Sequence, residues 1–220
     1  KYFKRLNEIS IYNLRFNDFF GNILMSWVKA SESKREESSK YLEEIPERYN
    51  NLKLIQKSLL HCYFDLPETE NSFNEIINNE EYNFSRYKFF LANYLLHKNE
   101  LKKAKKIFGN DKNKYNSLLN KEIDNSILTG NHKKATNFFN CKNSVDNIAE
   151  IFYLIANLYS TEEYYQMSNF YLKISFFFNN KFIPNKALIA DNFFKQKKYD
   201  DSKKIYSSLQ SIGPVYSWYS

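Results

Sequence analysis

The amino-acid sequence predicts an all-α protein built from stacked antiparallel helix pairs. The chain has 220 residues but only four glycines and four prolines, too few for the many turns of a β-sandwich or barrel. Apolar residues recur at intervals of three and four, as in Phe90, Leu91, Tyr94 and Leu95, which is a helical period. A related stretch returns every 31 to 34 residues, and such a period is typical of repeat architectures.

A small residue recurs at one position of six consecutive units and marks the phase of the repeat. These markers are Ser38, Ser72, Ala104, Ala135, Ser168 and Ser202. Four positions after them stand large apolar residues, namely Leu42, Ile76, Phe108, Phe139, Leu172 and Tyr206. Twelve positions before them stand Ser26, Leu60, Ala92, Ile123, Ala156 and Ala190. Helix axes approach to about 8–10 Å where side chains are small, so we expect helices to meet at these positions.

Each unit is predicted to be a helix, a short polar turn and a second helix. The turns are the segments HKNE, TGNH, STEE and KQKK, and Gly130 suits such a turn because glycine readily adopts positive φ. Pro46, Pro184 and Pro214 fall near the first turn of the following helix, where proline is tolerated. One pair cannot bury its apolar stripe alone, so we expect the pairs to stack.

The phase of the repeat divides the chain into three parts. Residues 1–18 are predicted to hold the end of a preceding helix or a truncated repeat. Residues 19–216 are predicted to form about six hairpins, with starts near Phe19, Lys53, Ser85, Asn116, Ala149 and Ile183. Residues 217–220 are expected to begin a further truncated unit, because no polar capping helix ends the array.

This pattern resembles the tetratricopeptide repeat family. The family motif carries a bulky residue, Leu, a small residue and Tyr, and later Ala, an aromatic residue, Ala and Pro, over 34 residues. The unit from Ala149 matches at Ile155, Ala156, Tyr159, Ser168, Leu172 and Ser175, but has Asn180 where Pro is usual. The unit from Ile183 matches at Ile189, Ala190, Phe193, Ser202, Tyr206 and Pro214, but has Leu209 at the last small position. The unit from Ser85 matches at Leu91, Ala92, Leu95, Ala104 and Phe108.

The resemblance implies a right-handed superhelical solenoid whose first helices line a concave groove. It also implies a protein-protein interaction module that binds an extended peptide or a helix of a partner, or that scaffolds an assembly. Asn side chains can bond to a bound backbone, and aromatic rings supply contact area. The residues predicted to line the groove are Trp27, Lys57, His61, Phe64, Arg86, Phe89, Asn93, His97, Asp124, Tyr153, Asn157, Asp191 and Phe194.

Two other functions stay open. The net charge of +7 and the lysines of residues 102–106 permit an RNA-binding helical repeat. They also permit a structural component of a membrane-associated or envelope complex, attached peripherally to acidic lipid through a basic convex face. One groove column includes the acids Asp124 and Asp191, which argues against nucleic acid as the partner.

The sequence predicts no enzyme, no cofactor and no metal site. His61, His97 and His132 fall in different units without an HExxH pattern, and the four glycines form no phosphate-binding loop. Cys62 and Cys141 form no CxxC pair and leave the compartment open between cytoplasm and periplasm. No apolar run is long enough for a transmembrane helix, so we expect a soluble domain.

Overall fold

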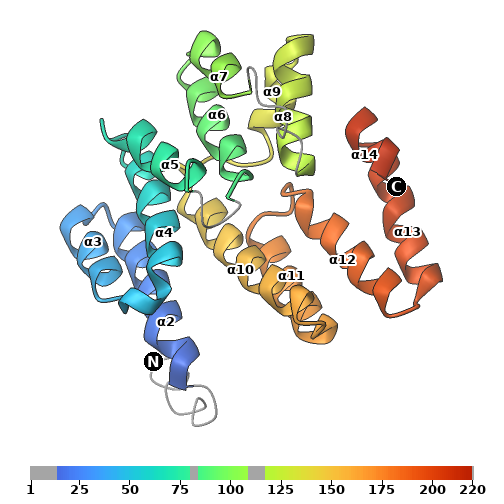
Figure 1. Cartoon of the computed structure of the whole chain (residues 1–220), viewed down its shortest axis with the longest axis horizontal. Helices are drawn as coiled ribbons and strands as arrows, with labels where there is room; N and C mark the ends of the chain where they lie inside the picture. Colours follow the sequence, from blue (N-terminus) through green and yellow to red (C-terminus); the bar gives the residue numbers. More distant parts are fainter. Residues whose placement is uncertain (1–13, 80–83, 109–116, 220) are drawn as a thin grey trace. The chain divides into compact units, whose positions relative to one another are not determined.

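The computed structural model of the chain describes residues 14–79, 84–108 and 117–219. Helices, joined by turns, make up the regular structure of these ranges, and no strand occurs in them (Figure 1). The predicted all-α class is therefore confirmed. Most of the predicted leading segment 1–18 and the predicted start at Asn116 lie outside the described residues.

The chain divides into two compact units, and the first comprises residues 1–82 and 141–144. Its described helices are α2 (Leu14–Ser31), α3 (Arg35–Glu43), α4 (Asn50–Tyr63) and α5 (Thr69–Ile77), with a short 3-10 helix, η2 (Glu47–Tyr49). Helix α2 packs against α3, and α4 packs against α5. Because α3 also packs against α4, the two pairs form one layered core.

The second unit comprises residues 83–140 and 145–220. Its helices are α6 (Tyr87–His97), α7 (Leu101–Ile107), α8 (Leu118–Thr129), α9 (His132–Thr136), α10 (Ser144–Thr161), α11 (Tyr165–Phe178), α12 (Pro184–Lys195), α13 (Tyr199–Gln210) and α14 (Pro214–Tyr219). Helices α6 and α7, α8 and α9, and α12 and α13 pack as pairs. Helix α10 packs against α11 through rings such as Phe152 and Tyr171, whose centroids lie 6.3 Å apart.

The same left-handed turn joins the two helices of every pair. Its central residue has a positive φ of 54° to 74°, and these residues are Ser33, Asp65, Asn99, Gly130, Glu163 and Lys197. In five of the six turns the next backbone N–H donates to a carbonyl five residues back, as from Leu66 to His61 at 2.9 Å. This bond caps the last turn of the first helix. Only one of the six positions is glycine, so the sequence does not reveal the regularity.

The small residues of the repeat lie where helices meet. All six residues of the earlier column, including Ala156 and Ala190, are at most 2% exposed. Of the six markers, Ser38, Ala104, Ser168 and Ser202 are buried, Ser72 is half-buried, and the side chain of Ala135 is not described. The Ser202 hydroxyl donates to the Ala190 carbonyl across the α12–α13 pair at 2.9 Å. The expected helix contacts at these columns are thus present in the described residues.

The second unit differs from a simple linear stack of pairs. Helix α14 packs against α8 as well as against the preceding α13, and Tyr216 of α14 is fully buried. In a regular repeat array each unit contacts only its sequence neighbours. The first helices also start earlier than the phase predicts in two cases, at Leu14 rather than Phe19 and at Ser144 rather than Ala149.

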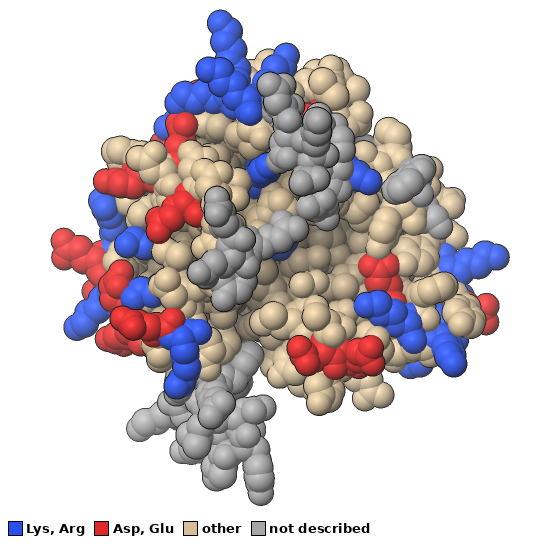
Figure 2. Space-filling view, viewed as in Figure 1, with Lys and Arg blue, Asp and Glu red and all other residues tan. Residues whose placement is uncertain are grey.

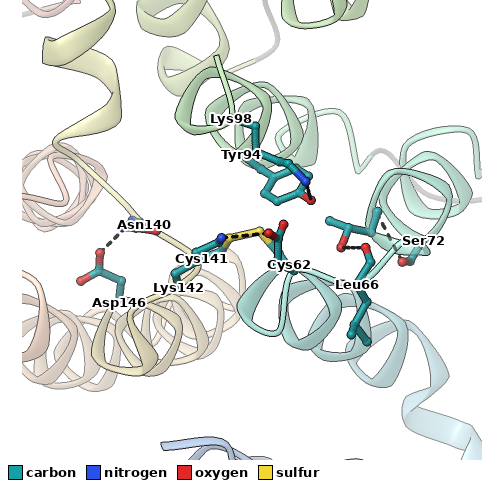
Figure 3. Close-up of a disulfide and its surroundings, with 11 residues drawn as sticks. Cys62, Leu66, Ser72, Tyr94, Lys98, Asn140, Cys141, Lys142 and Asp146 are labelled. Carbon is teal, nitrogen blue, oxygen red and sulfur yellow. Dashed lines mark hydrogen bonds and ion pairs between the residues drawn. A yellow bond between two sulfur atoms is a disulfide. The ribbon is translucent and has the colours of Figure 1, made fainter. Parts of the chain in front are cut away.

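A disulfide joins the two cysteines inside the first unit. Cys62 lies near the end of α4, and Cys141 lies in the segment 141–144 that precedes most of α10 (Figure 3). Their Cα atoms are 5.8 Å apart, and 79 positions of sequence separate them. Both residues are buried, and the neighbouring Lys142 ammonium pairs with the Asp65 carboxylate at 3.1 Å. The bond therefore holds a distant part of the chain on α4.

Enlarging a buried alanine of the small column should destabilise the fold. The Ala190→Leu variant is expected to lower the free energy of unfolding by about 1–3 kcal/mol, because added methylenes overpack a closely approached helix crossing. Urea denaturation monitored by circular dichroism measures this change. The matched control is Lys103→Leu at an exposed position of α7, which should stay within about 0.5 kcal/mol of the parent. Equal midpoints for the two variants would contradict the packing described for this column.

Candidate functional site

A pocket in the second unit opens between the first helices of successive pairs. It has a volume of about 340 Å³ and takes residues from the starts of α6 and α8, from the middle of α10, from α12 and from α14. We call it the second-unit pocket. Its lining residues are Arg86, Ser117, Leu118, Leu119, Tyr153, Leu154, Asn157, Pro184, Ala187, Leu188, Asp191 and Tyr219.

Proline and helix geometry explain part of this arrangement. Pro184 occupies the first turn of α12, as predicted, where a missing N–H costs no helical hydrogen bond. Leu154 and Leu188, and likewise Asn157 and Asp191, are 34 positions apart, so each pair occupies the same position on α10 and α12. Side chains at equivalent positions of stacked helices point to the same side of the stack, which brings these four residues to one pocket.

Arg86 lies at the edge of the pocket and forms a buried ion pair with Glu150 of α10. Two guanidinium N–H groups donate to the two carboxylate oxygens at 2.7 and 2.9 Å. The Arg86 side chain is 18% exposed, whereas the Glu150 side chain is 0% exposed. The guanidinium also lies 4.6 Å from the ring centroid of Tyr153, a favourable cation–π distance. Arg86 therefore lines the pocket, and its guanidinium is paired with the Glu150 carboxyl, which is buried in the protein.

Burial dominates the titration of this ion pair. Desolvation raises the pKa of Glu150 to about 7, and the nearby Arg86 guanidinium only partly opposes that rise. Burial likewise raises the pKa of Tyr153, so its hydroxyl stays protonated at neutral pH. The Glu150 carboxyl is thus the group of the second-unit pocket region whose charge changes near neutral pH.

A carboxylate held by two tyrosines also lines the pocket. Asp191 of α12 accepts hydrogen bonds from the hydroxyls of Tyr206 on α13 and Tyr219 on α14. The bond from Tyr219 is 2.6 Å long. Burial raises the pKa of both tyrosines, and the Asp191 carboxylate raises it further. Both phenols therefore remain hydrogen-bond donors, and they fix the direction of the carboxylate.

The structure brings four of the predicted groove residues together in this pocket, namely Arg86, Tyr153, Asn157 and Asp191. Three others in the same unit are buried instead: Phe89, Asn93 and Asp124. Phe89 and Asn93 belong to α6, which is enclosed by α7, α8 and α9. Those two predictions are corrected by this burial, since a ligand cannot reach the side chains, and the same holds for Asp124 of α8. His97 and Phe194 are exposed but lie outside the pocket.

In the first unit the four predicted groove residues do not form one surface. Trp27 is 1% exposed, and its indole N–H donates to the Gln56 side chain at 2.7 Å, so its assignment to a groove is corrected to the core. Phe64 is half-buried beside the Tyr63 ring. Lys57 and His61 line a separate hollow of about 280 Å³ between α4 and α5.

His61 has a structural environment in that hollow. Its Nδ1 lies 2.8 Å from the Ser72 hydroxyl, which itself donates to the Glu68 carbonyl. Desolvation lowers the pKa of His61, and the nearby Lys57 lowers it further, so the imidazole is neutral at pH 7. A neutral histidine that bridges two helices of a pair explains the position without a ligand.

Several pocket residues were missed by the sequence prediction. Leu154 and Leu188 could have been found from their spacing of 34 positions. Glu150, the partner of Arg86, does not line the pocket and carries no such signal, because it lies 64 positions from Arg86 and becomes its partner only through tertiary packing. Tyr219 was missed because α14 packs on α8 rather than continuing the array.

The described residues hold no arrangement suited to metal binding, since no three His, Cys, Asp or Glu side chains in them lie close enough to share an ion. Within the same residues, no helix has the length and apolarity needed to cross a membrane. Lysine side chains gather over α7 (Figure 2), where Lys102, Lys103, Lys105 and Lys106 are exposed as predicted. Lys103 also pairs with Glu100 at 2.7 Å.

Comparison with protein-family models, with curated proteins and with solved structures finds no match to this chain.

Proposed function

We propose that this chain is a non-catalytic protein-interaction module that binds an extended peptide or a helix of a partner. The observation that carries the proposal is the second-unit pocket, which takes side chains from the first helices of successive pairs. Such a surface, with apolar leucines and a few convergent polar groups, is typical of ligand sites. Asn157 and Tyr153 supply donors and acceptors for a bound backbone.

A solenoid of the tetratricopeptide type is the architecture that we propose for the chain. The identical left-handed turns and the buried small columns support a repeated hairpin. The packing of α14 on α8 is a departure from a regular array, and we propose that it closes one end of the groove. The proposed occupant therefore enters from the side of α10 and α12.

Peptide is favoured over RNA by the charges of the pocket. Its two charged lining residues are Arg86 and Asp191, and Arg86 is already paired with Glu150. The remaining negative charge would repel phosphates, whose neutralisation by Lys and Arg drives nucleic-acid binding. An uncharged peptide backbone meets no such repulsion.

A role as a scaffold is supported by a second surface on α11. Met167, Phe170 and Phe177 are 41%, 54% and 83% exposed and follow one another at helical spacing along the same face. Exposed apolar side chains gathered on one face commonly mark an interaction site. The buried face of the same helix carries Ser168, Leu172 and Ser175, so the exposed face does not form part of the core.

The disulfide supports an oxidising compartment. Disulfides persist in secreted and periplasmic proteins and are rare in the cytosol, so of the two compartments predicted from the sequence the periplasm is favoured. Maleimide labelling of protein isolated from its own cells without reductant tests this point. Labelling of Cys62 and Cys141 after unfolding, without reduction, would place the protein in a reducing compartment instead.

Blocking the pocket should abolish peptide binding. A library of random short peptides displayed on phage is selected against the full chain and against Leu188→Trp, which puts a larger, uncharged side chain on an apolar wall of the pocket. We expect the parent to enrich a defined sequence class and the variant to bind it roughly tenfold more weakly or not at all. Fluorescence anisotropy of the enriched peptide gives both affinities.

The matched control is Lys203→Trp, an exposed position of α13 outside the pocket, which should bind like the parent. Circular dichroism melts confirm that both variants fold. Enrichment of the same peptides by the parent and by Leu188→Trp would reject the second-unit pocket as the binding site.

A further inference from the structure

We propose that the second-unit pocket binds a peptide through one lysine or arginine side chain, whose cationic group pairs with the Asp191 carboxylate. This inference rests on the proposed function and names the chemistry of the residue that the pocket selects. It follows from the charges of the pocket, from the groups around Asp191 and from the nature of the walls.

The first argument is the balance of charge. The ionisable acid and base side chains that line the pocket are Arg86 and Asp191. Arg86 makes a bidentate pair with the buried Glu150, so its charge is balanced within the protein above pH 7, where Glu150 is ionised. Asp191 accepts hydrogen bonds from two neutral phenols, and in the described ranges no Lys, Arg or His side chain lies within ion-pair distance of it. Within the described part of the chain, Asp191 is thus the charged lining residue that has no counter-charge at such a pH.

The nearest candidate on the same helix does not supply the missing charge. Lys195 is one helical turn beyond Asp191, a spacing that allows an ion pair. Its ammonium instead lies 5.9 Å from the ring centroid of Tyr165, and the side chain is exposed. Among the described residues, Lys195 therefore leaves Asp191 available to pair with a ligand cation.

The second argument is the orientation of the carboxylate. Tyr206 and Tyr219 donate one hydrogen bond to each of its two oxygens, and the raised pKa values of both phenols keep these donors in place. Each carboxylate oxygen can accept more than one hydrogen bond, so both keep acceptor capacity for an ammonium or guanidinium. A preorganised acceptor of this kind reduces the ordering cost of binding.

The third argument is the composition of the walls. Leu154, Leu188 and Ala187 line the pocket together with the ring of Tyr153. Lysine and arginine carry an aliphatic stem below their charged group and bury it along apolar surface. Tyrosine rings add a cation–π contribution for the same head group. A basic side chain therefore fits both parts of the pocket, whereas an acidic one fits only the apolar walls.

The test uses the peptides enriched by the full chain in the display selection described above. We expect one fixed position of the enriched class to be Lys or Arg. A synthetic peptide of that class, acetylated at its N-terminus so that the side chain is the cation under test, is compared with the same peptide carrying acetyl-lysine there. Loss of the charge should weaken binding roughly tenfold or more.

The protein is changed in the same experiment. Asp191→Asn removes the charge but keeps an oxygen that can accept from a tyrosine, and it should bind the basic peptide as weakly as the parent binds the acetyl-lysine peptide. The matched control is Asp200→Asn, an exposed acid in the first turn of α13, which should bind like the parent. Melting curves check that both variants are folded.

The outcomes separate this inference from the proposed function. If peptides bind the parent and not Leu188→Trp, but show no basic position or bind Asp191→Asn equally well, the pocket binds peptide and the pairing at Asp191 is wrong. If the parent enriches no peptide that Leu188→Trp fails to bind, the proposed function is itself rejected. The pairing is supported only if the affinity for the peptide falls both when its lysine is acetylated and when Asp191 is replaced by Asn.

Discussion

Removing the disulfide is expected to lower the free energy of unfolding by about 2–5 kcal/mol. The change is Cys62→Ala together with Cys141→Ala, and urea denaturation in the absence of reductant measures it. The cross-link joins residues 79 positions apart, and a closed loop of this length strongly restricts the unfolded chain. Both sulfur atoms are buried, so the loss of packing acts in the same direction as the loss of the cross-link.

Reduction provides the control for this prediction. The parent with reductant should unfold at a lower urea concentration than the parent without it, but at a higher one than the double variant, which also lacks the buried sulfur atoms. Reductant should not change the variant. A parent whose unfolding is insensitive to reductant would show that the two cysteines are not joined in the folded protein. Such a result would also remove the argument for an oxidising compartment.

Replacing Arg86 by methionine is expected to destabilise the chain by about 3–5 kcal/mol at pH 8, because it leaves the buried Glu150 carboxylate without its counter-charge. Glu150 is 0% exposed and Arg86 is 18% exposed at the side chain. The matched change Glu150→Gln should therefore cost less, since the Arg86 guanidinium can still reach water through the pocket. Thermal and urea denaturation of the two variants compare these costs.

The cost of Arg86→Met should depend on pH. Burial raises the pKa of Glu150 in the folded chain to about 7, above its ordinary value of 4.5. A protonated Glu150 therefore contributes stability that is fully present below pH 4.5 and is lost as the pH rises through 7. Relative to Glu150→Gln, the parent should lose about 1 kcal/mol per pH unit within this window.

At pH 5 the carboxyl is neutral in the parent, so the cost of Arg86→Met should be smaller than at pH 8. Equal costs at the two pH values would mean that Glu150 stays ionised throughout, and that the attraction of Arg86 outweighs burial. The comparison with Glu150→Gln removes the pH dependence of all other groups.

The all-α class and the places where helices meet could be predicted from the sequence. Both follow from local patterns: the helical period places Leu91 and Tyr94 on packed faces, and a column of small residues marks close approach, as at Ala190. Pro184 and Gly130 are also informative, because their backbone preferences allow few positions in a helix pair. These signals depend on the chain near each residue and not on the tertiary structure.

The accessible residues of the pocket could be predicted only in part. Extending the phase of the repeat to the first helices correctly predicts four of its lining residues, namely Arg86, Tyr153, Asn157 and Asp191. The same extension failed at Phe89 and Asn93, because α6 is covered on more sides than the repeat pattern assumes. Whether a polar residue of a first helix faces solvent depends on its neighbours in space.

The interactions that define the site chemically could not be predicted at all. Glu150 meets Arg86 across 64 positions, and Tyr219 reaches Asp191 from a helix that the repeat did not include. The turns present the opposite case, since Ser33, Glu163 and Lys197 adopt positive φ although their residue types disfavour it. There the packing of the paired helices overrides local preference.

Site-directed photocrosslinking tests the central claim most directly. Benzoylphenylalanine is placed at Asn157, an exposed position that lines the second-unit pocket, or at Lys203, an exposed position of α13 outside it, and the enriched basic peptide is added before irradiation. We predict a crosslinked product from the Asn157 position, lost when unlabelled peptide competes, and none from the Lys203 position. Equal crosslinking from both positions, or none from Asn157 while the peptide still binds, would contradict a peptide site between α10 and α12.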